Sequence, residues 1–125
     1  FMDEKYIESL ELAREELNKI LVYRENLLNY YKMFKNSLES LQALKNTKEL
    51  FLPLGSDVFV FSEVKNLDSI LVNVGNNIFL EMNLEEAEEF LKRRISEIEE
   101  EINNVTLYAQ SIQNYINELL RTLKK

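Results

Sequence analysis

The sequence predicts an α+β fold in which a long antiparallel two-helix coiled coil carries two central β-hairpins. Three observations lead to this prediction. The 125 residues include only two glycines and one proline, all of them in the middle of the chain, so the two flanks have few places to turn. In both flanks, apolar residues recur at alternating steps of four and three. In the middle, Val, Ile and Phe replace Leu and Glu, as is typical of β-strands.

The first flank, residues 4–48, is predicted to be one coiled-coil helix. A coiled-coil seam needs an apolar residue about every 3.5 positions. Arg24 is the one position in this flank that interrupts the series. The predicted seam positions are Tyr6, Leu10, Ala13, Leu17, Ile20, Arg24, Leu27, Tyr31, Phe34, Leu38 and Leu41.

The stretch LFLPLGSDVFVF, residues 50–61, opens a block of four short predicted strands that ends at residue 82. Gly55-Ser56-Asp57 and Gly75-Asn76-Asn77 each suit a three-residue hairpin loop. Loops of this length predict a definite strand register. The predicted pairs are Leu52 with Val60, Leu54 with Val58, Ile70 with Met82, Val72 with Leu80, and Val74 with Ile78.

Both faces of this strand block are predicted to be largely apolar, because apolar residues occupy successive positions rather than alternate ones. Two helices that pack against each other cannot cover both faces, so the block predicts self-association or a sister subunit. The alternative is a sandwich of the two hairpins within one chain, which would still leave the aromatic face uncovered. The predicted oligomer interface is Phe51, Pro53, Phe59, Phe61, Leu71, Val74, Ile78, Phe79 and Leu80.

The second flank, residues 83–125, is predicted to be the returning helix. Asn83 and Glu86 have the spacing of a capping box. Glu88 is the one seam position in this flank that is not apolar. The predicted seam is Leu84, Glu88, Leu91, Ile95, Ile98, Ile102, Val105, Ala109, Ile112, Ile116, Leu119 and Leu123.

The two seams match layer for layer when the chain is folded back on itself. Leu10 with Leu119 and Leu27 with Ile102, for example, both have residue numbers that sum to 129. This correspondence predicts an antiparallel hairpin of helices. Arg24 and Glu88 are open to two interpretations: polar layers that fix the register, or long side chains that reach from the seam into water. The second interpretation is favoured.

Composition excludes several classes of function. The chain has no cysteine and no histidine, which removes thiol and imidazole chemistry and the usual zinc ligands. The net charge of -7 argues against nucleic acid as a partner. Glutamate runs such as Glu15-Glu16 and Glu99-Glu100-Glu101 are interpreted as solvated faces, so no enzyme activity, catalytic residue, metal or other cofactor is predicted. No apolar run suits a membrane span and no signal peptide is recognised, so a cytoplasmic protein without a membrane partner is expected.

The layout of helix, two hairpins and helix resembles the prefoldin family, in its α class. The motifs that carry this resemblance are LPLGSDVFV at 52–60, ILVNVGNNIFLE at 70–81 and EEAEEFLKRR at 85–94. The segment FSEVKNLD departs from the family by lacking a glycine near the strand bend, and Ile78-Phe79 stands where paired aromatics are common. The resemblance covers nearly the whole chain and implies a single prefoldin-like domain over 1–125.

The resemblance also implies a function. Prefoldins are archaeal and eukaryotic ATP-independent chaperones. Their hairpins join in a β-barrel-like hub, and their coiled-coil tips hold unfolded or nascent proteins. These proteins then pass to a group II chaperonin. Other prefoldin subunits, of the β class or copies of this chain, are the implied partners. The alternative is a structural filament protomer, because some divergent archaeal α-like members polymerise through their hairpins.

Client binding is expected at apolar side chains near the chain ends. Some of these lie off the seam, and others become reachable if the last turns fray. Scattered surface apolar residues are also ordinary on any protein. The predicted client-binding residues are Ile7, Leu10, Leu12, Tyr115, Leu119, Leu120 and Leu123.

Overall fold

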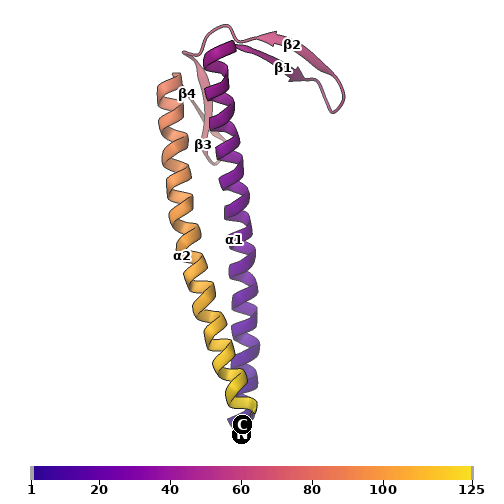
Figure 1. Cartoon of the computed structure of the whole chain (residues 1–125), viewed down its shortest axis with the longest axis vertical. Coiled ribbons are helices and arrows are strands. Elements are labelled where there is room, and N and C mark those ends of the chain that lie inside the picture. Colours follow the sequence, from indigo (N-terminus) through magenta and orange to yellow (C-terminus); the bar gives the residue numbers. More distant parts are fainter. Residues whose placement is uncertain (1, 125) are drawn as a thin grey trace. The chain divides into compact units, whose positions relative to one another are not determined.

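The computed structural model describes residues 2–124 and places two long helices and two hairpins in the predicted order. The elements, shown in Figure 1, are α1 (Met2–Thr47), β1 (Glu49–Pro53), β2 (Phe59–Glu63), β3 (Ile70–Gly75), β4 (Ile78–Met82) and α2 (Leu84–Lys124). The described residues fall into two compact units. The coiled-coil unit is residues 2–32 with 97–124, and the hairpin unit is residues 33–96. The predicted fold class is confirmed; the first and last residues of the predicted domain lie outside the described residues.

Helix α1 ends at Thr47 and is followed by a left-handed residue. Lys48 has a φ of 55°, and its N–H donates to the carbonyl of Leu44 at 3.2 Å, which closes the last turn. The Thr47 hydroxyl oxygen accepts the N–H of Glu49 at 2.9 Å, at the first residue of β1. The chain therefore changes from helix to strand within one residue, without the glycine that usually stands at such a position.

Helix α2 begins with the predicted capping box. The Asn83 side-chain oxygen accepts the N–H of Glu86 at 2.8 Å, and the Glu86 carboxylate accepts the N–H of Asn83 at 3.2 Å. These two bonds satisfy donors that the first turn of a helix leaves without partners.

In the coiled-coil unit the two helices run antiparallel and bury a common core (Figure 1). Its buried residues come from both helices: Leu10, Ala13, Ile112, Ile116 and Leu119. Half-buried seam residues pack on this core: Tyr6, Leu17, Ile20 and Leu123. The packing agrees with the pairing of early with late residues that the seam predicts.

The two helices differ in how their apolar residues are distributed. In α2 most of them form one stripe, which is buried at Ile98, Val105 and Ala109 as well as in the core, and the exposed exceptions are Leu107, Tyr108 and Tyr115. In α1, large apolar residues also point to solvent away from the seam, among them Val22 and Met33. Helix α1 therefore presents apolar surface that α2 does not cover.

The first hairpin has the predicted register. Leu52 pairs with Val60 and Phe51 with Phe61, and the Leu54 N–H donates to the Val58 carbonyl at 2.7 Å. Gly55 has a φ of 93°, a left-handed conformation that suits a residue without a Cβ.

The second hairpin corrects one predicted pair. Ile70 pairs with Met82 and Val72 with Leu80 as expected, but Ile78 pairs with Gly75 rather than with Val74. The turn consists of two residues, Asn76 and Asn77, with φ of 52° and 58°. Both have the positive φ of a type I′ turn, which asparagine tolerates well. The shorter turn leaves one extra residue on β3, and a bulge between Asn73 and Gly75 absorbs it.

In the hairpin unit, the ends of the helices also pack on each other. Ala87, Leu91 and Ile95 of α2 are buried. The guanidinium carbon of Arg94 lies 5.7 Å from the centre of the Phe34 ring, a cation–π contact between the helices. Glu88 is buried and forms an ion pair with Lys45 across the helix pair, with 2.7 Å between Nζ and Oε1.

Candidate functional site

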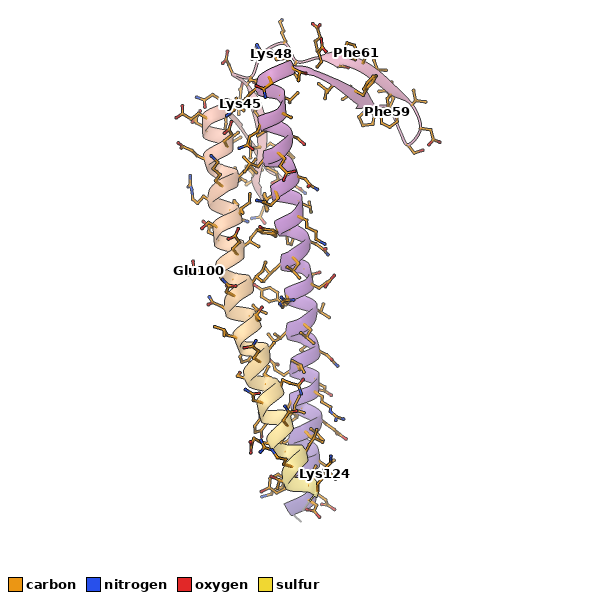
Figure 2. All side chains as sticks on the ribbon, viewed as in Figure 1. Lys45, Lys48, Phe59, Phe61, Glu100 and Lys124 are labelled. Carbon is orange, nitrogen blue, oxygen red and sulfur yellow. The ribbon has the colours of Figure 1, made fainter. Side chains whose placement is uncertain are left out.

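The first hairpin exposes an aromatic face. The Phe51 and Phe61 rings stack edge to face with their centres 5.5 Å apart, and Pro53 pairs with Phe59 on the same face. Phe51 is 65% exposed and Phe61 56% exposed. Figure 2 labels Phe59 and Phe61 on β2, two residues apart and therefore on one side of the strand. Such a surface is unusually apolar for a solvated hairpin.

The opposite face of this hairpin is also apolar and open. Leu52 is 47% exposed and Val60 is 43% exposed, and Leu54 and Val58 beside the turn are exposed as well. The β1–β2 sheet has only two strands, so each strand also has an edge without a ladder partner in its sheet. Two-stranded hairpins are marginal in water, and open apolar edges pair with other chains. The hairpin thus exposes apolar side chains on both faces and unpaired backbone groups at its edges.

The second hairpin differs because one side of β3 is half-covered. Ile70, Val72 and Val74 are half-buried, whereas Leu71 between them is 70% exposed. On β4, Ile78, Phe79 and Leu80 are all exposed. Of the nine predicted interface residues, Val74 is therefore the one that the chain itself partly covers.

The predicted tip residues fall into three groups by burial. Ile7, Leu12 and Tyr115 are exposed; Leu120 and Leu123 are half-buried against the core; Leu10 and Leu119 are buried in it. The exposed group is available without any change in the helices. The buried pair holds the two helices together, so a substitution there alters folding as well as any binding.

Both interruptions of the seam have polar partners across the helix pair. The Arg24 Nε–H donates to the Thr106 hydroxyl at 2.8 Å, and that hydroxyl donates to the Ile102 carbonyl at 2.7 Å. Glu88 is paired with Lys45. Sequence reasoning favoured side chains that reach into water; it missed these contacts because Thr106 lies beside the seam, and because Lys45 lies one step of four beyond Leu41, the last seam position predicted in the first flank.

Two glutamates that were interpreted as solvated faces contact tyrosines instead. The Tyr108 hydroxyl donates to Glu16 at 3.2 Å and the Tyr23 hydroxyl to Glu101 at 3.5 Å. Both glutamates are half-buried, whereas their neighbours Glu15 and Glu100 are exposed. The Glu16 carboxylate raises the pKa of the Tyr108 phenol above 10.0, through its charge first and the hydrogen bond second.

The described residues contain no group of three or more His, Cys, Asp or Glu arranged to hold a metal ion. In the same part of the chain, none of the helices is apolar enough over its length to cross a membrane.

Comparison with known proteins identifies the family. The family model described as "Prefoldin subunit" matches residues 6–125 of this chain. The chain belongs to the prefoldin family. It is 31% identical over 120 residues to the prefoldin subunit alpha of Archaeoglobus fulgidus, a match that covers 94% of this chain and 88% of that relative. It is 32% identical to human protein UXT over 120 residues, which cover 92% of this chain and 76% of that protein.

A solved prefoldin structure is also similar. The filamentous PFD from Methanocaldococcus jannaschii aligns with a TM-score of 0.60 and 25% identity, covering 94% of this chain and 93% of that one. Prefoldins assemble with other prefoldin subunits into oligomers or filaments, and they are a family of chaperones rather than of enzymes. The expected α-type resemblance and the coiled-coil and hairpin fold are thereby confirmed.

Proposed function

We propose that the chain is a subunit of an ATP-independent holdase chaperone, whose hairpins join those of other prefoldin subunits and whose helix ends capture unfolded proteins. The observation that carries this proposal is the exposure of apolar residues on both faces of the first hairpin. Burying such surface contributes about 25 cal/mol per Å², so a partner hairpin is strongly favoured over water. Delivery of the captured protein to a group II chaperonin, and a cytoplasmic location, belong to the same proposal.

The proposed hub contacts are the nine predicted interface residues. Phe51, Phe59 and Phe61 supply rigid aromatic surface, of the kind that dominates the energy of interfaces. The free strand edges supply backbone hydrogen bonds to a neighbouring hairpin. Val74 contributes less to a contact with another subunit, because it is half-buried within this chain.

Capture of unfolded proteins is proposed to use the exposed apolar residues near the helix ends. Ile7, Leu12 and Tyr115 offer contacts that do not depend on the sequence of the bound segment. A test replaces all three with serine and measures how well the protein suppresses aggregation of a heat-denatured client. The matched control replaces Val22 and Leu107, which are at least as exposed as the tip residues and lie in the same unit but farther from the chain ends.

The tip variant is expected to lose most of the protection, and the control is expected to retain it. Circular dichroism should report the same helix content for both variants, because none of the substituted side chains is buried. Equal protection by the two variants would overturn capture at the tips.

A second proposed function is that of a structural filament protomer. The observation that favours it is the similarity, over 94% of the chain, to a PFD solved as a filament. The apolar faces of both hairpins would let copies of one chain join without a second subunit type. Light scattering and electron microscopy of the purified chain separate the two proposals. Long polymers of the chain alone would support the filament proposal. A small species that becomes larger only after a β-class subunit is added would contradict that proposal.

A further inference from the structure

A row of tyrosines follows one edge of the helix pair in the coiled-coil unit. Tyr23 of α1 bonds to Glu101 of α2, and Tyr108 of α2 bonds to Glu16 of α1. In both pairs the residue numbers sum to 124, so the pairs are successive rungs on the same edge. Each rung thus holds one tyrosine ring and one carboxylate, contributed by opposite helices.

The two rungs have a fixed spacing. On each helix they are seven residues apart, which corresponds to about 10.5 Å along the axis. The tyrosine rings are about half exposed, at 45% for Tyr23 and 46% for Tyr108. A ligand can therefore reach the ring and the carboxylate of both rungs without any rearrangement of the helices.

The chemistry of a rung favours a cation. The face of an aromatic ring attracts ammonium and guanidinium groups, and the adjacent carboxylate adds a full negative charge. One hydrogen bond from a tyrosine hydroxyl uses a small part of what a carboxylate can accept, so Glu16 and Glu101 retain acceptor capacity. The raised pKa of the Tyr108 phenol agrees with a negative potential at this rung.

We propose that the two rungs form a binding site for two cationic side chains, preferably arginines, that stand three residues apart in one extended polypeptide segment. In a polyproline II conformation, residues three apart lie on the same face at about 9.3 Å, close to the rung spacing. Guanidinium also suits both a ring face and a carboxylate. Between the rungs, the exposed Asn104 of α2 offers a donor and an acceptor to the backbone of the segment.

This site is separate from the surfaces of the proposed function. It uses neither the hairpins nor the exposed apolar residues near the helix ends, and it recognises charge rather than apolar surface. It therefore stands or falls independently of capture at the tips. One group opposes it: Lys19 lies on α1 between Glu16 and Tyr23, and its ammonium repels an incoming cation.

The experiment measures fluorescence anisotropy of labelled peptides with the full chain at low ionic strength, where screening is weak. The probe is a proline-rich peptide with two arginines three residues apart. Two comparison peptides have the same length, one with adjacent arginines and one with both arginines replaced by glutamine. The spaced peptide is expected to bind most tightly.

Matched variants separate the rungs from the overall charge of the chain. Glu16→Gln and Glu101→Gln are each expected to weaken the spaced peptide about two- to five-fold. Glu15→Gln and Glu100→Gln change the same charge on exposed neighbours, and Figure 2 shows Glu100 on the side of α2 away from α1. They are expected to change binding less than about two-fold, in line with the weakness of screened surface charges.

Ring variants test the aromatic contribution. Tyr23→Leu with Tyr108→Leu is expected to weaken binding about five- to twenty-fold, whereas the corresponding phenylalanine variant retains most of it, because the ring face remains. Lys19→Gln is expected to tighten binding. Equal binding of the three peptides, equal loss in the neighbouring glutamate variants, or unchanged binding in the leucine variant would each overturn the site.

Discussion

Lys45 and Glu88 form an ion pair between the last turns of α1 and the first turns of α2, with 2.7 Å between Nζ and Oε1. The Glu88 oxygen is buried and has no hydrogen bond among the described residues, so charge attraction rather than an aligned hydrogen bond is the contact that compensates it. The Lys45 side chain is 46% exposed, which weakens the attraction through solvent screening.

Lys45→Met is therefore expected to destabilise the chain by about 1–3 kcal/mol, because it leaves a buried carboxylate without its cation. The double variant Lys45→Met with Glu88→Leu is expected to recover most of that loss by turning the site into an ordinary apolar layer. Chemical denaturation followed by circular dichroism measures both. A single variant as stable as the parent chain would show that the pair contributes nothing.

Thr106→Val is expected to cost about 1 kcal/mol of folding stability, because it removes the hydroxyl that accepts the Arg24 Nε–H. Thr106→Ser keeps that oxygen and serves as the control. Its expected loss of folding stability is well below that of the valine variant. Thermal unfolding at a fixed protein concentration compares them. If valine and serine were equally stable, the Arg24 bond would have no part in holding the helices.

Phe59→Glu is expected to disrupt the assembly while leaving the helices folded. The substitution places a charge on the aromatic face of the first hairpin, and burying an unpaired charge in an interface is strongly unfavourable. Ser56→Glu adds the same charge in the hairpin loop, and Phe59→Leu keeps an apolar side chain; both controls should assemble. Mass photometry or light scattering gives the size, and circular dichroism the helix content. An undiminished assembly in the Phe59→Glu variant would contradict the proposed interface.

Tyr108 is expected to titrate at higher pH than a tyrosine in an unfolded chain. Its pKa is raised above 10.0 mainly by the charge of Glu16. The contribution of Tyr108 to stability is thus fully present below pH 10.0 and is lost as the pH rises through the raised pKa of the folded state. A pH titration followed by ultraviolet absorbance should show that the pKa of one tyrosine is lower in Glu16→Gln than in the parent chain. In Glu15→Gln that pKa should be unchanged.

Much of this fold can be predicted from the sequence, because its strongest determinants are periodic. The seams of the two helices are continuous enough that single polar residues such as Arg24 do not obscure them. The Asn83–Glu86 capping box is a local signal with a direct structural counterpart, as both of its hydrogen bonds are present. Where neighbouring side chains and the backbone favour the same local geometry, the sequence pattern alone is enough to predict that geometry.

The errors have equally specific causes. The turn after β3 is one residue shorter than the sequence predicts, because Gly75 ends the strand with a φ of 127° and Asn76 and Asn77 by themselves form the turn. The tyrosine rungs lie beside the seam, so a search for apolar periodicity passes over them. Pairing the positions whose numbers sum to 124 would have revealed Tyr23 opposite Glu101 and Tyr108 opposite Glu16.

The exposed tyrosines of the coiled-coil unit also give the molecule an intrinsic optical reporter. The chain has six tyrosines and no tryptophan, so its intrinsic ultraviolet emission comes mainly from phenol rings. Tyr23, Tyr30, Tyr108 and Tyr115 are all exposed in the coiled-coil unit, and the hairpins contain none. Emission from the unlabelled protein should therefore change when a ligand binds to the coiled coil and stay nearly unchanged when hairpins associate. One spectrum would thus distinguish ligand binding from assembly.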